Sequence, residues 1–341
     1  MGFLRLTGDA ERDVGAVEGW LAAAEAEPLA ISTSGSSGRP KQVLLERAAV
    51  LASAAGSSAR LGGTGPWLLA LPSSYVAGFN VVVRSLVAGH RPVVLGDRTP
   101  VAVATEGAFV SVVPTQLHRW LDSPGDGTAL ARCHTVLVGG GPVDPSLRAR
   151  AAEAGVRLVA TYGSAETCGG CVYDGLPLDG VALAVAVDGR IRIGGPTLFR
   201  GYLDDPVATR DSLVDGWFVT SDAGRLDDDG RLRVLGRVDD MVVSGGVNVP
   251  AAAVAARLRE HPAVSAAEVV GLPDLEWGNR VVAVLALEEE LTLEETRDWV
   301  AVVHPRAWAP RQVRVVPALP MLANGKVDRL AVRDLAAGAG R

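Results

Sequence analysis

The chain has 341 residues, of which 48% are hydrophobic, and its formal net charge is −6. This length allows two domains, or one large and one small domain, and the apolar content predicts a real core and excludes a disordered chain. The acidic balance, with no block of basic residues, argues against nucleic acid as the main partner.

Targeting and redox signals point to the inside of the cell. The N-terminal residues form no apolar signal stretch, and the longest apolar runs are too short to cross a bilayer. The three cysteines make no disulfide framework. We therefore expect a cytoplasmic protein with no membrane insertion. The sequence leaves its oligomeric state open, and a homo-oligomer is compatible with it.

The first half of the chain is predicted to alternate short strands and helices, a pattern typical of an α/β fold. Helices are expected at residues 12–26, 44–61, 76–88 and 144–154. Strands are expected at residues 28–31, 67–71, 92–95, 109–113, 135–138 and 156–162. Pro114 suits the first turn of a further helix.

The pattern changes after Tyr173, where Asp-Gly pairs at 188–189, 215–216 and 229–230 predict an antiparallel β region. Asp227–Asp229 could form a metal loop, but a solvated hairpin tip is the better interpretation. From Asp239 a smaller unit is predicted, with Thr292 and Glu295 as the capping box of one helix. Its other expected elements are helices at 250–260 and 327–335 and strands at 266–270, 280–287 and 313–316.

These elements predict a large N-terminal domain, residues 1–238, of mixed α/β layers plus an antiparallel β region. A small, mobile α+β C-terminal domain, residues 239–341, is expected to follow.

The stretch from Ser32 to Lys41 packs hydroxyl residues, glycines and two cations into ten positions. Glycines let backbone N–H groups turn toward an anion, and a lysine meets phosphate as a point charge. It is not a Walker A loop, because Pro40 stands where the second glycine would be. The alternative is a flexible Ser/Gly linker. The predicted polyphosphate ligands are Thr33, Ser34, Gly35, Ser36, Ser37, Gly38 and Lys41.

Two further clusters suit a nucleotide. In Thr161–Thr167, Tyr162 can stack on a purine and Glu166 can hold Mg²⁺ through oxygen, although a strand-end turn with a solvated glutamate is the alternative. Asp222 can accept hydrogen bonds from ribose and Arg237 can donate to ribose or phosphate, although a surface ion pair would look the same. The assigned nucleotide-binding residues also include Gly163, Ser164 and the run Gly139, Gly140 and Gly141.

The last two clusters lie in the smaller unit. Ser244, Gly245 and Gly246 allow close backbone approach by a ligand, or simply form a turn. Lys326 follows the Asn324-Gly325 turn, where an isolated lysine would usually be solvated.

Taken together and in this order, the clusters resemble the adenylate-forming superfamily of acyl- and aryl-CoA ligases, peptide-synthetase adenylation domains and firefly luciferase, over about residues 29–335. The resemblance implies ATP, Mg²⁺ held through Glu166, and coenzyme A as co-substrate. It further implies Lys326 as the catalytic lysine, Asp239 as a catalytic hinge, and Ser244–Gly246 as the face for the pantetheine arm. Two positions differ from the family pattern: Ala165 replaces a threonine, and Tyr75 replaces a histidine near the acyl pocket.

The early phosphate loop and the stretches 75–78, 84–89 and 169–175 are similar to the compact o-succinylbenzoate–CoA ligases of menaquinone biosynthesis. This resemblance assigns Tyr75, Gly78, Arg84, Gly169 and Gly170 to the acyl pocket. A dicarboxylate substrate would need a basic partner there, for which Arg84 and His90 are candidates.

Cys168 and Cys171 are interpreted as small residues of the same acyl pocket, ahead of a zinc or redox pair. The partners implied are a small carboxylic acid, ATP and CoA. Alternatives are another acyl- or aryl-CoA ligase, an adenylation enzyme loading a carrier protein, and a nucleotide-binding protein without catalysis. A luciferase-type oxygenase has no residue that specifically supports it.

Overall fold

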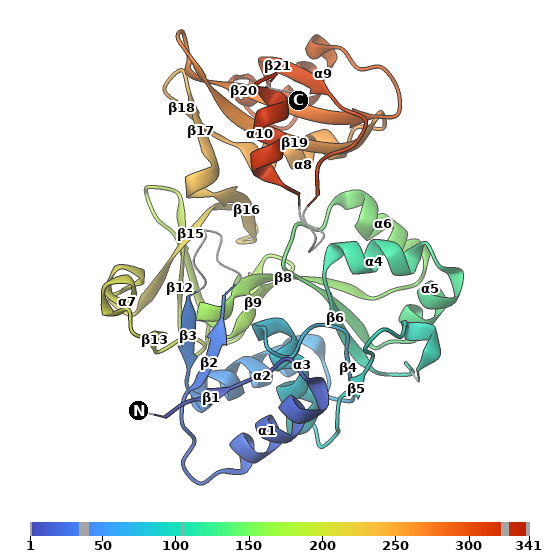
Figure 1. Ribbon diagram of the computed structural model, residues 1–341, viewed down its shortest axis with the longest axis vertical. Helices are drawn as coiled ribbons and strands as arrows, with labels where there is room; N and C mark the ends of the chain where they lie inside the picture. Colours follow the sequence, from blue (N-terminus) through green and yellow to red (C-terminus); the bar gives the residue numbers. More distant parts are fainter. Residues whose placement is uncertain (1, 34–40, 104, 322–326, 339–341) are drawn as a thin grey trace.

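The structure is a computed structural model that describes residues 2–33, 41–103, 105–321 and 327–338. Figure 1 shows a large lower body and a smaller upper body, which are joined through β16 and β17. Among the described residues, no helix is both long enough and apolar enough to cross a membrane.

A four-stranded sheet, in the order β1-β2-β3-β13, carries the predicted phosphate loop. The loop connects β2 to β3, which pair antiparallel, and β13 adds to the far side of β3. The helix α1 (Ala10–Ala22) buries Val14, Val17 and Trp20. The strands are β1 (Leu4–Arg5), β2 (Leu29–Ser32), β3 (Gln42–Leu45) and β13 (Gly201–Tyr202).

The central layer is a seven-stranded sheet in the order β10-β9-β8-β7-β6-β4-β5, parallel from β5 to β8. Its strands are β4 (Trp67–Leu69), β5 (Val93–Val94), β6 (Phe109–Val112), β7 (Thr135–Val138), β8 (Leu158–Ser164), β9 (Gly169–Tyr173) and β10 (Leu176–Pro177). Helices flank it: α2 (Arg47–Leu61), α3 (Val76–Val87), α4 (Pro114–Leu121), α5 (Pro124–Ala131) and α6 (Pro145–Glu153), with a 3-10 turn η1 (Pro100–Ala102).

Alternation along these strands divides the core between the two faces of the sheet. Phe109 and Leu137 pack with side chains of α2 and α3, whereas Val110 and Val136 pack with those of α4, α5 and α6. Successive side chains of a strand point to opposite faces, so one apolar strand serves both layers. Burial of these side chains stabilises the fold by roughly 25 cal/mol per Å² of apolar surface removed from water.

The antiparallel region predicted after Tyr173 is confirmed, with β11-β12-β15-β14 in one sheet and β16 paired to β15. Residues 227–231 form the turn between β15 and β16, which confirms the hairpin tip at Asp227–Asp229. Its elements are β11 (Ala182–Val185), β12 (Arg190–Gly194), α7 (Pro206–Ser212), β14 (Leu213–Val214), β15 (Trp217–Leu226) and β16 (Leu232–Arg237).

The upper body is built on the sheet β19-β20-β21, whose two faces are both covered. Val281 and Ala283 pack with side chains of α8, whereas Val282 and Val284 pack with Val332 of α10. Its elements are η3 (Val238–Asp240), β17 (Met241–Ser244), β18 (Val247–Pro250), α8 (Ala251–Arg259), β19 (Val264–Asp274), β20 (Gly278–Leu287), α9 (Leu293–Ala301), η4 (Arg306–Trp308), β21 (Gln312–Val315) and α10 (Arg329–Ala336). The capping box of Thr292 and Glu295 is present at the start of α9.

Three local expectations were wrong or incomplete. Residues 44 and 45 belong to a strand and not to the helix, because β3 finds partners in β2 and β13. The helix α5 was not expected from a segment with Pro124 and two glycines, yet Leu130 packs into the core and Asp126 accepts the Val101 N–H. Strand β9 was not expected either, and it forms because it pairs with β8.

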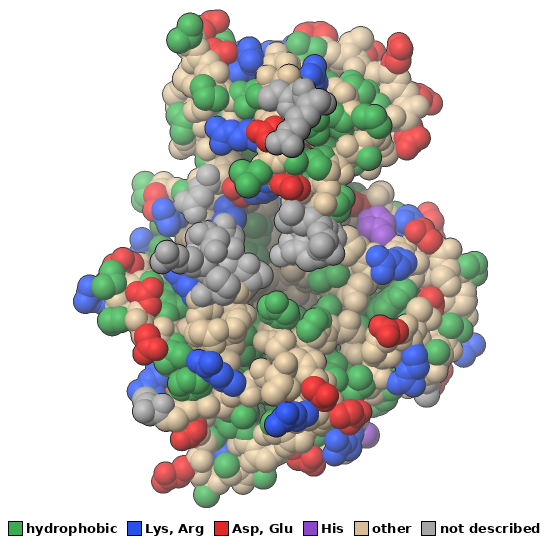
Figure 2. Space-filling model, in the orientation of Figure 1, with side chains coloured by type: hydrophobic (Ala, Val, Ile, Leu, Met, Phe, Trp, Pro, Cys, Tyr) green, Lys and Arg blue, Asp and Glu red, His purple; other side chains and the backbone are tan. Residues whose placement is uncertain are grey.

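Buried apolar side chains group separately on the two sides of residue 239. In the part of the chain that the structure describes, buried apolar side chains form four clusters. Two of them lie between Val14 and Leu232 and two between Val242 and Ala336, so none combines residues from both sides. The space-filling view shows a constriction between the two bodies (Figure 2).

Candidate active site

The two ends of the predicted phosphate loop are fastened to each other. The Thr33 N–H donates to the Lys41 carbonyl at 2.8 Å, and the Lys41 N–H donates to the Thr33 hydroxyl at 3.2 Å. Both residues continue the antiparallel ladder of β2 and β3. Ser34, Gly35, Ser36, Ser37 and Gly38, which the sequence assigned to phosphate binding, lie outside the described residues.

Tyr162 and Asp222, which are sixty residues apart, are in contact. The Tyr162 hydroxyl donates to Asp222 Oδ2 at 2.8 Å. Burial raises the pKa of Tyr162 far above its usual value, and the neighbouring Asp222 charge adds to the shift, so the phenol stays a donor. Asp222 on β15 stands directly opposite Arg237 on β16. The aromatic ring and the two predicted ribose partners therefore gather at the end of β8.

Gly163 allows the turn that follows Tyr162. A Cβ at this position would lie 2.1 Å from the Gly169 carbonyl oxygen, so only glycine fits where β9 pairs with β8. The pairing of β8 with β9 shifts register between Tyr162 and Gly163, which is a bulge that re-aims the strand end. The short helix η2 (Ala165–Thr167) then presents Glu166 beside this end.

Glu166 is oriented by a residue that the sequence analysis missed. The Tyr202 hydroxyl donates to Glu166 Oε1 at 2.9 Å, and burial followed by the Glu166 charge raises the pKa of Tyr202 well above its usual value. The Lys41 ammonium lies 4.5 Å from the centre of the Tyr202 ring. Among the described residues no group of three His, Cys, Asp or Glu side chains could hold a metal. A single carboxylate beside a phosphate loop suits Mg²⁺, which is commonly held by one or two carboxylates plus substrate phosphates.

The hydroxyls on either side of Ala165 differ in their availability. Thr167 is fully buried, and its hydroxyl is engaged with the Ser164 N–H and with the carbonyls of Ser164 and Gly169. The Ser164 hydroxyl oxygen is buried and has no hydrogen-bond partner among the described residues. Of the two, only the Ser164 hydroxyl is thus left without a partner in the described part of the chain.

A cavity of about 150 Å³ lies next to these residues and brings together several of the predicted pocket positions. Arg84 is the cation of this cavity, only 6% exposed, in the last turn of α3. Its Nη2 donates to the Tyr173 hydroxyl at 3.1 Å, and its guanidinium lies 5.2 Å from the centre of the Trp67 ring. Its Nε is buried and has no partner among the residues that the structure describes. Within the described residues no carboxylate pairs with it. The predicted residues that line the cavity are Arg84, Gly139, Gly140, Gly163, Gly169 and Gly170.

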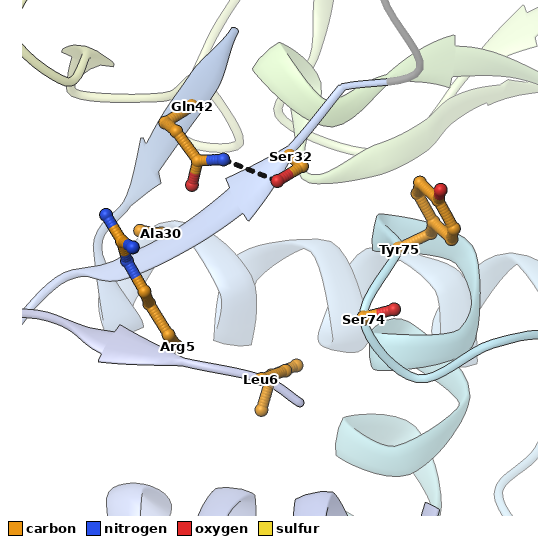
Figure 3. Close-up of a pocket in the computed structure, with 7 residues that line it drawn as sticks. All are labelled: Arg5, Leu6, Ala30, Ser32, Gln42, Ser74 and Tyr75. Carbon is orange, nitrogen blue, oxygen red and sulfur yellow. Dashed lines mark hydrogen bonds between the residues drawn. The ribbon is translucent and has the colours of Figure 1, made fainter. Parts of the chain in front are cut away.

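Three other pocket candidates lie apart from this cavity. Tyr75 lines a second hollow, of about 280 Å³, where the start of α3 faces Ser32 and Gln42 (Figure 3). Gly78 packs against the preceding turn, where a Cβ would lie 2.2 Å from the Pro72 carbonyl oxygen. His90 is exposed beyond the end of α3. Gly141, assigned to the nucleotide, is exposed and does not line either hollow.

The cysteines do not line the cavity, contrary to the expectation from sequence. Cys168 and Cys171 are fully buried in the core. The Cys168 carbonyl accepts hydrogen bonds from Ser53 and Asn80, at 3.1 and 2.8 Å, which fixes the turn after Glu166. Burial raises the pKa of the Cys168 thiol to about 12 and that of Cys171 to about 11, so neither is a ready thiolate.

In the upper body, the Ser244 hydroxyl is buried and unpartnered among the described residues, and the Gly245 N–H donates to the Trp277 carbonyl. Gly246 has a left-handed φ of 78° and open space around its Cα. Lys326 lies outside the described residues, but Met321 and Val327 on either side of its loop form an antiparallel bridge. The backbone of Asp239 belongs to η3.

Tyr202 could not be assigned from sequence, because it follows no periodic pattern. Its neighbour Gly201 and its scarcity, as one of four tyrosines, were the only signals. Asn80 and Tyr173 also line the cavity, and the sequence analysis assigned neither to it. Asn80 lies inside the predicted helix 76–88, and Tyr173 lies where the predicted antiparallel β region begins.

Comparisons with known proteins identify the family of the chain. A family model described as AMP-binding enzyme matches residues 24–203, and a model described as AMP-binding enzyme C-terminal domain matches residues 253–326. A probable 2-succinylbenzoate–CoA ligase of Mycobacterium tuberculosis is 44% identical over 319 residues, which are 89% of this chain and 83% of that protein.

The fold of the chain is also similar to solved structures. The o-succinylbenzoate CoA synthetase (MenE) of Bacillus subtilis, in complex with the acyl-adenylate intermediate OSB-AMP, superposes with a TM-score of 0.77 at 29% identity, over 90% of this chain and 69% of that one. The same enzyme was solved with ATP and a magnesium ion. The amide bond synthetase McbA of Marinactinospora thermotolerans reaches a TM-score of 0.80 at 28% identity, over 91% of this chain and 70% of that one.

Proposed function

The chain belongs to the AMP-binding enzyme family, and from this premise we propose that it is an ATP-dependent ligase joining 2-succinylbenzoate to coenzyme A in menaquinone biosynthesis. The proposal is supported by the name of its 44% identical relative and by the likeness to a synthetase solved with its acyl-adenylate. The substrates are then a small carboxylic acid, ATP and CoA.

The burial of Arg84 without a carboxylate partner among the described residues is the observation that supports a dicarboxylic acid as substrate. A guanidinium buried without a carboxylate is costly, because desolvation of a charge is repaid only by a close counter-charge and hydrogen bonds. The C-terminal turn of α3 and the Trp67 ring offset part of this cost. The side chain of Arg84 lines the same cavity as Gly169 and Gly170. A second carboxylate on the substrate is the partner that this cavity lacks.

In the first half-reaction, a substrate carboxylate oxygen bonds to the α-phosphorus of ATP and the bond to pyrophosphate breaks. Thr33 and Lys41 hold the base of the loop for the leaving phosphates, and Tyr162 with Asp222 holds the adenosine. Lys326 is assigned to the carboxylate and the α-phosphate, where it offsets developing charge. Mg²⁺ would be held by Glu166, and when bound it neutralises phosphate charge.

In the second half-reaction, the CoA sulfur bonds to the acyl carbon, the thiol proton is lost to solvent and AMP leaves. We propose that the chain divides into a domain of residues 1–238 and a domain of residues 239–341 that reorients about Asp239 between the two steps. The separate cores on either side of this boundary support the division, and the two family matches end and begin on opposite sides of it. Ser244–Gly246 would then meet the pantetheine arm.

The testing experiment supplies ATP, Mg²⁺ and CoA with 2-succinylbenzoate, benzoate or a fatty acid, and measures thioester and AMP. We expect thioester formation with 2-succinylbenzoate well above the other acids. Thioester formation that is faster with the other acids would reject the substrate. Substrate-dependent ATP–pyrophosphate exchange with no thioester would instead indicate a carrier-protein-loading enzyme, and no exchange with any acid would indicate a protein that only binds nucleotide.

A further inference from the structure

The segment from Phe199 to Leu203 joins the base of the phosphate loop to Glu166. Its backbone pairs with β3, since Arg200 N–H donates to the Leu44 carbonyl at 2.9 Å and Leu203 N–H donates to the Gln42 carbonyl at 2.8 Å. At its start, the Phe199 N–H donates to the Glu166 carbonyl at 2.8 Å. One short stretch of chain is thus fixed to both halves of the phosphate and metal site.

Tyr202 projects from this segment and contacts a functional group on each side. Its hydroxyl holds one oxygen of the Glu166 carboxylate, and its ring lies under the Lys41 ammonium. The ring of Tyr202 is buried and packs edge-to-face on the ring of Phe199, with the two ring centres 5.0 Å apart. The backbone N–H of Tyr202 donates to the Thr209 hydroxyl. A side chain fixed in this way can hold two flexible partners in place.

We propose that Tyr202 is a positioning residue that sets the Glu166 carboxylate for the metal–nucleotide complex and places the Lys41 ammonium at the base of the phosphate loop. The proposal rests on the proposed function, since it assumes that ATP and a divalent cation bind here. The hydroxyl orients Glu166 through a hydrogen bond that leaves its other oxygen for the cation. The ring keeps Lys41 pre-organised, which lowers the entropy lost when phosphate binds.

The two roles use different parts of the side chain, so two substitutions separate them. Tyr202→Phe removes the hydroxyl and keeps the ring, while Tyr202→Leu removes both. Outer-shell partners of metal ligands typically contribute ten- to a hundredfold in metal affinity, so the Phe variant should need roughly ten to a hundred times more cation. Loss of the ring should weaken metal-free ATP binding by roughly fivefold in the Leu variant only.

The experiment measures ATP binding by titration calorimetry in EDTA and in Mg²⁺, and Mn²⁺ binding by EPR in the presence of ATP. No acid substrate is present, so a wrong acid in the proposed function would not affect the result. We expect Tyr202→Phe to weaken Mn²⁺ binding with ATP affinity in EDTA unchanged, and Tyr202→Leu to weaken both. Thr296→Val is the control, because it removes a buried hydroxyl in α9, away from Glu166 and Lys41, and should leave cation binding unchanged.

A double-mutant cycle with Glu166→Gln identifies the pathway of the effect. If Tyr202 acts through the Glu166 carboxylate, Tyr202→Phe should have little further effect on Mn²⁺ binding once Glu166 is glutamine. Additive losses would overturn the assignment to Glu166, as would unchanged Mn²⁺ binding in Tyr202→Phe. Equal ATP affinity of the Leu and Phe variants in EDTA would overturn the role assigned to the ring. A melting temperature within a few degrees of the parent protein is the condition for comparing the variants.

Discussion

Arg84→Met separates recognition of the acid from stability of the fold. The methionine fills much of the same volume without a charge, next to Tyr173 and Trp67. Leaving a substrate carboxylate buried and unpaired costs about 2–5 kcal/mol, so about 3 kcal/mol, or roughly a hundredfold in kcat/KM, is expected for 2-succinylbenzoate. Thioester formation with purified parent and variant enzymes measures this loss.

The effect on stability should be small, for reasons seen in the structure. The variant loses the bond from Arg84 Nη2 to the Tyr173 hydroxyl, which costs about 1 kcal/mol, but that hydroxyl keeps Ser57 at 2.9 Å. Removal of an unpaired buried cation offsets this loss, so the free energy of unfolding should change by no more than about 1 kcal/mol. Urea denaturation monitored by fluorescence gives this value.

The matched substrate control is the ester of the succinyl carboxylate, which keeps the shape of the acid but has no second charge. The parent enzyme should discriminate against the ester, and Arg84→Met should abolish most of that discrimination. An equal loss of kcat/KM for the acid and the ester, or a loss of several kcal/mol in unfolding free energy, would refute the assignment of Arg84 to the second carboxylate.

Three other predictions follow from the site and its surroundings. Lys326→Ala should abolish ATP–pyrophosphate exchange yet spare thioester formation from preformed acyl-adenylate, whereas Asp239→Pro should impair mainly the latter; equal effects on both steps would argue against the two roles. Gly163→Ala should lower the free energy of unfolding by about 3 kcal/mol, because its Cβ would lie 2.1 Å from the Gly169 carbonyl oxygen of the paired strand β9. An unchanged free energy of unfolding would argue against that packing. Burial raises the pKa of the Cys168 thiol from 9.0 to about 12, so the folded thiol stays protonated where the unfolded one ionises. The free energy of unfolding should therefore fall as pH rises from about 9 to about 12, and the native thiol should resist labelling at pH 8; rapid labelling would contradict its burial.

Some of the site could be predicted from sequence because its signals are local. Asp222 and Arg237 lie on strands joined by an Asp-Gly turn, so their hairpin could be predicted. A register shift between Ala223 and Gly224, which the sequence does not reveal, then puts Asp222 opposite Arg237. The strand predicted at residues 156–162, which in the structure continues to Ser164, and the turn that carries Glu166 were likewise predictable from an apolar run followed by small and polar residues. The capping box at Thr292 is local in the same sense, since its two partners are three residues apart.

The remaining features depend on strand order and on packing between distant segments. β3 and β13 pair across the whole N-terminal region, and this pairing, together with the bond from the Phe199 N–H to the Glu166 carbonyl, brings Tyr202 to Lys41 and Glu166. Similarly, the sequence shows Arg84 only as one polar position in an apolar helix. The packing of α3 against β9 is what encloses it beside a cavity. The order of residues along the chain establishes which chemical groups are available and which local turns display them. Tertiary structure decided which of them are buried, oriented and left without a partner, because those properties arise from contacts between residues far apart in the chain.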